Sequence, residues 1–298
     1  MTIDYQAVKH WPFAEAVCDY QADDCIRYAL SLGMASDPFD EEDLRFVLEY
    51  DQLVLPTFLA TVGAPGAWAT HPDTGIDWMQ ILHGEHRMQF FDALPPSGKL
   101  LNKTQVVSVV DKGAGKGALV TTVRDVSDAV TGKPLARVEH VSFCRADGGY
   151  SASGAPSDAP LPALPAVPDR APDLQLEMPT LKNAALLYRL NGDRNPIHAV
   201  PSAWKKAGFD QPILHGLCTF GMAARGLVKL LCADAPQRLK SIAARFSSPV
   251  FPGETLVLSA WRADGETLHF EVHVKERKIK VLSNGVATVS SSPVSHVA

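Results

Sequence analysis

The chain has 298 residues, 46% of them hydrophobic and 20% charged, with a formal net charge of −5 and a pI near 6.0. This length suits two domains, and the composition is that of a globular protein with a sizeable core. The acidic balance argues against a nucleic-acid partner, and no stretch is long and charge-free enough to predict a membrane span.

The five cysteines also bear on the cellular compartment. They are odd in number, scattered, and form no CxxC pair. This usage favours a reducing compartment. The first residues do not follow the basic-then-apolar pattern of a signal peptide, and the last three are not a peroxisomal SKL-type address. We therefore expect a cytoplasmic protein.

The first part of the chain, residues 1–149, predicts helices followed by strands. Apolar spacing predicts a helix at 23–32, ended by Gly33, another at 42–50, and a short one before His83. Three β-rich runs separated by Gly-containing turns predict strands at residues 104–110, 118–126 and 134–145.

Residues 150–172 differ from the rest of the chain because they hold six prolines and few large side chains. Such a composition is typical of an extended linker between two folded halves. An ordered loop crossing the surface is the alternative. Either interpretation divides the chain into a first half at 1–149 and a second at 173–298.

The second half repeats the order of helices before strands. Helices are predicted at 183–190 and 202–207, and a longer one at 217–232 whose apolar residues are spaced as in a buried helix. The predicted strands follow it, at residues 242–246, 255–263, 267–274 and 278–290. A weak internal repeat relates residues 87–100 to 245–256, because each reads as a strand, a Pro/Gly turn and a second strand.

The motif YRLNGDRNPIH at residues 188–198 carries the first chemical signal. It places Asp193 five positions before His198, and five helical residues would turn about 500° and separate the two side chains. Asn195 precedes a proline, which disfavours helical backbone. We therefore expect an irregular overhang that aims both groups at one point, where a carboxylate and an imidazole form a general acid/base pair.

The segment ILHGLCTFG at residues 213–221 carries the second signal. Gly216 stands at the predicted start of the long apolar helix, where backbone N–H groups are unpaired and the helix dipole is positive. Such an N–H group can hold a carbonyl oxygen that becomes an oxyanion. Each piece also has a plain structural interpretation, with Asp193 in a turn, His198 in the core and His215 as a helix cap.

Together, these motifs resemble the hydratase 2 signature of the MaoC-like (R)-specific 2-enoyl-CoA hydratases, including the hydratase unit of peroxisomal multifunctional enzyme type 2. Further segments of the same unit are matched in order, namely LPTF, LHGE, LPPSGK, VDKGAG and RFSSPVFPG at residues 55–58, 82–85, 94–99, 110–115 and 245–253. The resemblance covers nearly the whole chain. It implies an α+β double hotdog fold, in which a curved antiparallel sheet surrounds a helix, and a homodimer.

The resemblance also implies an activity, namely addition of water to trans-2-enoyl-CoA to give (3R)-3-hydroxyacyl-CoA, and the reverse, in fatty-acid metabolism such as β-oxidation. His198 is the expected base, Asp193 its acid/base partner, Asn195 a group orienting the water, and Gly216 the oxyanion donor. The implied substrate contacts are His83, Gly84, Lys112, Arg194, Pro196, Ile197 and Phe246. The first half is then a degenerate hotdog that binds acyl-CoA, and the second half is catalytic.

Two alternative functions stay open, and neither a cofactor nor a metal is expected. Hotdog proteins include acyl-CoA thioesterases, and a non-catalytic acyl-CoA-binding protein would share the fold. We expect no cofactor, because the glycines at 113–117 lie between strands and not before a helix. We expect no metal, because His83 and His86 have no third ligand spaced nearby in the sequence. His86 stands where the family commonly has Gln.

Overall fold

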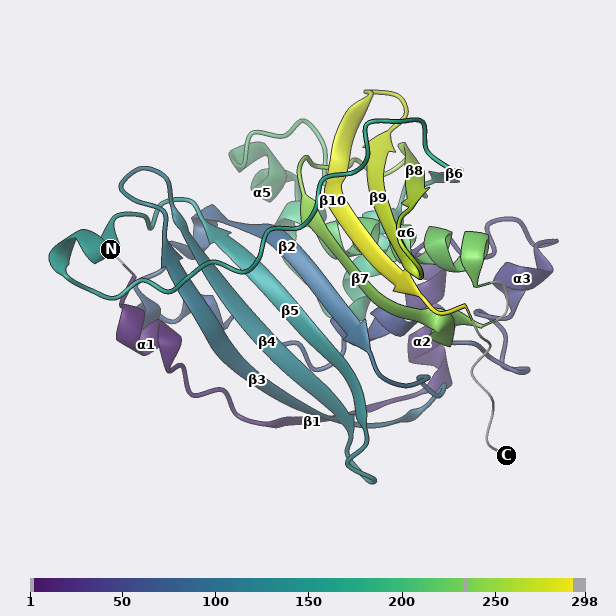
Figure 1. The fold of residues 1–298 in the computed structure, drawn as a ribbon, viewed down its shortest axis with the longest axis horizontal. Coiled ribbons are helices and arrows are strands. Elements are labelled where there is room, and N and C mark those ends of the chain that lie inside the picture. The colour runs from purple at the N-terminus through teal and green to yellow at the C-terminus, as the bar shows by residue number, and fades with distance from the viewer. Residues whose placement is uncertain (1–2, 233–234, 292–298) are drawn as a thin grey trace.

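A computed structural model describes residues 3–232 and 235–291 of the chain. Ten strands form one antiparallel sheet in the order β1-β3-β4-β5-β2-β7-β10-β9-β8-β6 (Figure 1). Their bounds are β1 (Ala16–Tyr20), β2 (Ile81–Phe90), β3 (Gly98–Asp111), β4 (Ala118–Asp128), β5 (Pro134–Cys144), β6 (Leu174–Pro179), β7 (Leu239–Phe246), β8 (Thr255–Arg262), β9 (Thr267–Val274) and β10 (Ile279–Val289). The predicted strands of both halves are therefore present.

The two halves of the chain meet in the middle of this sheet, where β2 pairs with β7. The register places Glu85 opposite Arg245 and His86 opposite Ala244. Each of these strands leads through a turn into the next strand of its own half, β3 and β8 respectively. The repeat seen in the sequence thus corresponds to β2 and β3 in the first half and to β7 and β8 in the second. Of these strands, β2 and β7 are neighbours at the junction, whereas β3 and β8 lie toward opposite edges of the sheet.

The central helix of the fold is α6 (Gly216–Leu231), which packs against β6, β7 and β10. Two glycines allow close packing on its two sides. A Cβ on Gly226 would lie 2.7 Å from Leu258 in β8, and a Cβ on Gly221 would lie 2.7 Å from the hydroxyl of Tyr28 in α2 (Ala22–Ser31). The helix is therefore enclosed between the second-half strands and a helix of the first half. This arrangement is the double hotdog fold.

Ion pairs also attach α6 to α3 (Glu41–Leu44) and the residue before it. Arg225 donates to Asp43 at 2.6 Å and to the carbonyl of Leu32 at 3.0 Å. Lys229 bonds Asp40 and lies 3.3 Å from Asp43. Asp43 is buried, so these bonds satisfy a carboxylate that has little access to water.

The helices confirm most sequence predictions and correct one. The segments α2, α4 (Ala184–Tyr188), α5 (Pro201–Lys206) and α6 lie where helices were predicted. A 3₁₀ turn (Trp78–Gln80) immediately precedes β2, where a short helix was predicted. The helix predicted at 42–50 ends at Leu44 and continues as turns. Beyond it, Leu48 and Tyr50 are exposed, so tertiary packing does not support further helical turns.

Among the α-helices and strands of the described residues, three short elements were not predicted from the sequence. These are α1 (Tyr5–Lys9) and the two edge strands, β1 and β6. Each edge strand pairs on one side only, β1 with β3 and β6 with β8. Five or six residues give too short an alternation of polar and apolar residues to stand out.

The proline-rich segment is ordered and crosses the sheet, as Figure 1 shows for the coil that runs toward β6. It contacts the sheet through Asp158, which accepts from Tyr5 and from the backbone N–H of Val109, and through Pro162, whose carbonyl accepts from Arg87. Of the two interpretations of this segment, the surface crossing is the one that the structure shows. The division at 149 and 173 stays a prediction.

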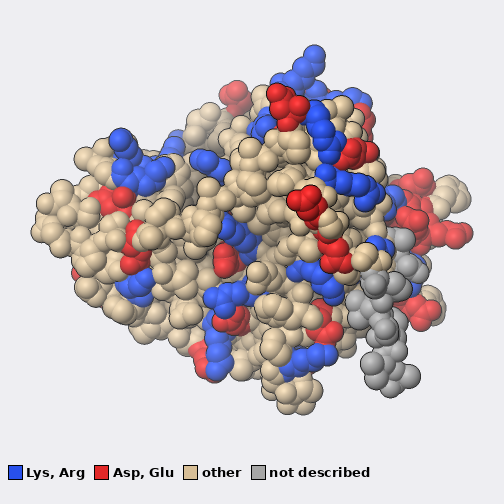
Figure 2. All heavy atoms as spheres, viewed as in Figure 1, with Lys and Arg blue, Asp and Glu red and all other residues tan. Residues whose placement is uncertain are grey.

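The surface carries charges of both signs. On the face in Figure 2, Lys and Arg side chains are interspersed with Asp and Glu around a broad area of other residues. In the described part of the chain, no helix combines the length and the apolar character that a membrane crossing needs. All five cysteines are free thiols.

Candidate active site

The segment between α4 and α5 forms the predicted overhang. After α4 the chain makes a 3₁₀ turn (Arg189–Asn191), and Gly192 then adopts a φ of +116°, a left-handed conformation that L side chains rarely adopt. A second 3₁₀ turn (Pro196–His198) follows, capped by Asn195 Oδ1, which accepts from the N–H of Ile197 at 3.1 Å. This pair of turns ends with His198 buried against the protein.

A hydrogen bond assigns the tautomer of His198. Its Nδ1 lies 2.8 Å from the carbonyl oxygen of Ile213. A carbonyl oxygen can only accept, so Nδ1 carries the proton and Nε2 of the neutral ring keeps its lone pair. His198 is therefore held in the form that can accept a proton at Nε2, which is what a general base requires.

His215 supports His198 from the other side. The two rings stack with centroids 3.6 Å apart and planes 26° apart. His215 Nε2 lies 3.3 Å from the carbonyl oxygen of Asp193, so this nitrogen is the N–H donor. His215 thus contacts both members of the predicted pair, through its ring face and through the backbone of the overhang.

Asp193, His198 and His215 form one group in which a ligand atom of each lies within 4.8 Å of the others. Asp193 is exposed, whereas both histidines are buried. Asp193 Oδ1 also accepts from the N–H of Asn195 at 3.1 Å, which fixes the orientation of the carboxylate. The predicted convergence of Asp193 and His198 is therefore present in the structure.

Burial lowers the pKa of both histidines below the usual value of 6.5. For His198, the bond to Ile213 and the charge of Asp193 partly offset this effect. For His215, burial is followed by repulsion from His198, which lowers its pKa further. Both rings are therefore neutral near pH 7, which keeps His198 available as a base.

Gly216 is the first residue of α6, and His215 is its N-cap. The first bonds into the helix run from the N–H groups of Cys218 and Thr219 to the carbonyl of His215. Among the described residues, the N–H of Gly216 has no acceptor. A Cβ on Gly216 would lie 3.1 Å from the ring of Phe246, so the glycine keeps the approach to this N–H open.

Phe246, the last residue of β7, contacts the first half of the chain beside Gly216. Its ring centroid lies 4.3 Å from that of His83, near the start of β2. The adjoining Gly84 sits tightly, because a Cβ there would lie 3.2 Å from the carbonyl oxygen of Val141. The structure therefore gathers four predicted site residues, His83, Gly84, Gly216 and Phe246, where β2 begins and β7 ends.

Lys112 lies at the same end of the sheet, in the turn between β3 and β4. It is exposed, with Nζ 4.9 Å from the ring centroid of Phe143, a residue that pairs with Leu82 in β2. Arg194 and Pro196 are exposed on the overhang, and Ile197 is partly buried. Within the described part of the chain, none of these four residues makes a side-chain hydrogen bond to Asp193 or His198.

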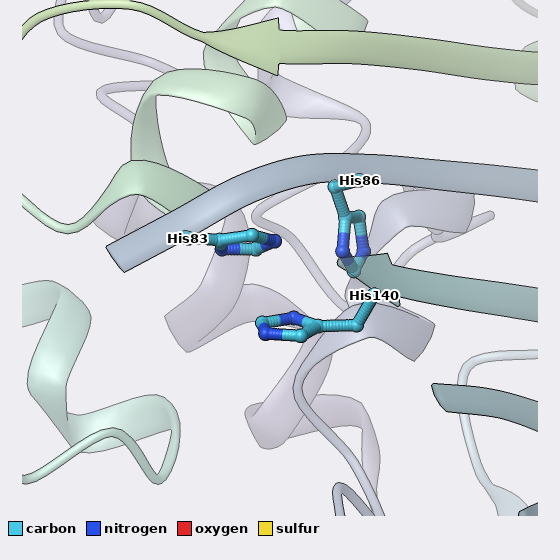
Figure 3. Close-up of side chains that lie close together, drawn as sticks. All are labelled: His83, His86 and His140. Carbon is cyan, nitrogen blue, oxygen red and sulfur yellow. The ribbon is translucent and has the colours of Figure 1, made fainter. Parts of the chain in front are cut away.

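A group of three histidines lies beside Phe246, because His140, which is distant in the sequence, comes close in space to His83 and His86. His140 in β5 stands opposite His86 in the register of β2 and β5. Figure 3 shows the rings of His83, His86 and His140 pointing into one space. A ring nitrogen of each lies within 4.8 Å of the others.

Two further residues, His215 and Tyr188, lie at this site and were not predicted as site residues. His215 precedes Gly216 in the motif and was expected at most to cap the helix. The sequence signal that could have identified it is its position next to the predicted oxyanion donor. Tyr188 is buried with its ring centroid 5.0 Å from that of His215, and its hydroxyl has no partner among the described residues. Tyr188 is the first residue of the motif at 188–198, and this position is the only sequence signal that indicated a role for it.

Two family models match successive parts of the chain. Residues 164–285 match the model of the MaoC like domain, and residues 18–146 match the model of the MFE-2 hydratase 2 N-terminal domain. The two matches together take in the overhang, the start of α6, β2 and Lys112.

Two curated relatives and one solved structure are similar over most of the chain. The 3-hydroxyacyl-thioester dehydratase Y of Mycobacterium tuberculosis is 40% identical, over 84% of this chain and 85% of that protein. The probable enoyl-CoA hydratase 2 of Dictyostelium discoideum is 34% identical over 97% of both. The crystal structure of a MaoC-like dehydratase from Phytophthora capsici superposes with a TM-score of 0.84, at 32% identity over 97% of this chain and 100% of that one. The chain therefore belongs to the MaoC-like hydratase 2 family of hydro-lyases.

Proposed function

We propose that the protein adds water across the C2=C3 bond of a trans-2-enoyl-CoA to give the (3R)-3-hydroxyacyl-CoA, and catalyses the reverse dehydration. The observation that carries this proposal is the tautomer of His198. Its Nδ1–H donates to the carbonyl of Ile213, which leaves Nε2 as a proton acceptor beside the Asp193 carboxylate. Family membership supports the reaction class, and this geometry supports the residue roles.

In the hydration direction, His198 Nε2 takes a proton from water as the water oxygen bonds to C3. The electron pair of the double bond moves through C2 onto the thioester oxygen, which becomes an oxyanion. The N–H of Gly216, at the positive end of α6, stabilises that charge. The pair of Asp193 and His198 then returns a proton to C2, so that one water has been added.

The overhang and the helix N-terminus also account for facial selectivity. Asp193 and His198 approach the substrate from one segment, so they hold the water and the transferred proton on one side of the planar enoyl group. A thioester oxygen bonded to Gly216 stops that plane from turning over. The geometry requires one enantiomer, and the R hand rests on the hydratase 2 resemblance.

For the substrate, the arrangement supports a CoA ester. Lys112 offers an ammonium to a phosphate, in a turn where Gly113 and Gly115 leave open space around the chain. Phe246 and His83 would contact the pantetheine or acyl part. The homodimer and the cytoplasmic location stay predictions.

The test is incubation with crotonyl-CoA while enoyl absorbance and free thiol are followed together. Loss of absorbance without thiol release, with the R alcohol found by chiral chromatography, is the expected result. Thiol release would instead identify a thioesterase, and a predominantly S product would reject the assigned hand. No change in either signal would reject catalysis on this substrate.

A further inference from the structure

The three histidines beside Phe246 are brought together by a β-bulge. In a regular strand, residues three apart point to opposite faces. The register of β2 against β5 shifts between His83 and Glu85, and this irregularity turns His83 to the same face as His86. His140 joins them from β5, directly opposite His86 (Figure 3). Three imidazoles thus share one side of the sheet.

These rings have nitrogen atoms that the fold leaves without a partner. Among the described residues, no hydrogen bond is made by His83 Nε2 or by either nitrogen of His86, and all three atoms are buried. His86 is 2% exposed and packs edge-on against Phe220 of α6 at 5.0 Å. Buried polar atoms are nearly always hydrogen-bonded, so three unpaired nitrogen atoms in one cluster point to a ligand.

We propose that His83, His86 and His140 form a binding site for one divalent transition-metal ion of the Zn²⁺, Co²⁺, Ni²⁺ or Cu²⁺ class. One nitrogen from each ring lies within 4.8 Å of the others, a spacing that small rotations of the side chains would close around an ion. Three imidazoles are a ligand set that these metals accept, with a fourth position left for water. His83 and His140 are partly exposed, so an ion can reach the site from solvent.

Two features of the surroundings bear on metal binding, namely the charge of Arg124 and the type of ligand atom. Burial is the main reason that the pKa of His86 and of His140 is lowered, and the positive charge of Arg124 lowers both further, so this guanidinium opposes a bound cation. Arg124 is itself bonded to the carbonyls of Leu59 and Val62 and to the side chain of Asn102. The cluster offers only imidazole nitrogens, which suit the late transition metals, and lacks the oxygen ligands that Ca²⁺ and Mg²⁺ require.

The site is tested by titrating Zn²⁺ into tag-free, chelator-treated protein by calorimetry. One ion should bind per chain, and zinc X-ray absorption should show three imidazole ligands at about 2.0 Å. The variants His86→Gln and His140→Gln keep side-chain bulk and polarity but remove a ligand. Each should weaken binding by about 100-fold or more, since losing a residue that merely orients a ligand costs about 10–100-fold.

Two controls separate this site from the rest of the protein. His71→Gln removes an exposed histidine and should leave Zn²⁺ binding unchanged. His198→Ala breaks the other group of potential ligands, Asp193, His198 and His215, and should also leave it unchanged. Loss of binding in His198→Ala with retention in His86→Gln would place the ion in the acid/base site and overturn the proposal, as would absence of stoichiometric binding.

The outcome does not depend on the proposed hydration. Neither His86 nor His140 has a role in that reaction, and the titration needs no substrate. Near-ultraviolet circular dichroism identical to that of the parent protein shows that a Gln variant is folded, so that its loss of binding can be assigned to the missing ligand.

Discussion

His198 and His215 stack face to face at 3.6 Å, and each donates to a different backbone carbonyl, His198 to Ile213 and His215 to Asp193. The two bonds fix both rings and tie the overhang to the start of α6. His198 is thus oriented by its hydrogen bond to Ile213 and by the stacked ring of His215. The Nε2–H of His215 in turn holds the backbone of Asp193. The proposed acid/base pair, Asp193 and His198, and the proposed oxyanion donor, Gly216, are therefore parts of one connected structure.

We predict that His215 is a positioning residue. His215→Leu removes the N–H bond to the Asp193 carbonyl and the stacked ring, so kcat should fall by about 10²-fold through misplacement of the pair, with KM little changed. His215→Gln offers an N–H near the same place and should recover part of the loss. Steady-state kinetics on crotonyl-CoA checks this. Equal losses in both variants, or a change confined to KM, would contradict it.

Lys112 is predicted to bind the CoA phosphates and to take no part in chemistry. Lys112→Ala should raise KM for the CoA ester about 5-fold, the equivalent of about 1 kcal/mol at an exposed site, with kcat near normal. Lys116→Ala, in the same turn, is the matched control and should have a smaller effect. A pantetheine substrate should not distinguish Lys112→Ala from the parent protein. If it does, the phosphate assignment is wrong.

Stability is predicted to fall in mild acid, because burial lowers the pKa of five histidines below the usual 6.5, to about 4 for His140. The others are His83, His86, His198 and His215. Between the unfolded and folded pKa values, the unfolded chain binds the extra proton. The free energy of unfolding should therefore be nearly flat above about pH 6.5 and decline below it, by up to about 1.4 kcal/mol per pH unit for each histidine.

Urea unfolding at several pH values between about 8 and 5 measures this decline. His86→Gln removes one of the five groups and should make the slope in mild acid shallower. A slope equal to that of the parent protein would show that His86 does not contribute.

The ion pair of Asp43 with Arg225 is predicted to contribute strongly to the free energy of unfolding, because it holds α6 against α3. Asp43→Ala leaves the guanidinium of Arg225, 11% exposed, without its carboxylate, and should lower the free energy of unfolding by about 3–5 kcal/mol. Glu41→Ala, on the exposed side of the same short helix, should change it by less than about 0.5 kcal/mol. Chemical denaturation compares the two. Similar values for both variants would contradict this role.

The sequence predicted the irregular backbone between Asp193 and His198 and the start of α6 well, because the signals for both are local. The Asn195-Pro196 step excludes a continuous helix, and the apolar run after Gly216 predicts where a helix begins. The sequence could not predict that Tyr28 packs against Gly221, or that His140 lies beside His83 and His86. These contacts depend on strand register and helix packing between distant parts of the chain, and the bulge after His83 has no sequence signature of its own.

The central claim is that Asp193 and His198 act as one catalytic unit, and the most direct test is kcat for crotonyl-CoA hydration in Asp193→Asn, His198→Ala and the double variant. Each single variant should lose about 10²–10⁴-fold, the usual contribution of general acid/base catalysis, and the double variant should be little worse than either. A folded single variant with near-normal kcat, or a double variant that loses the product of the two single effects, would contradict the account.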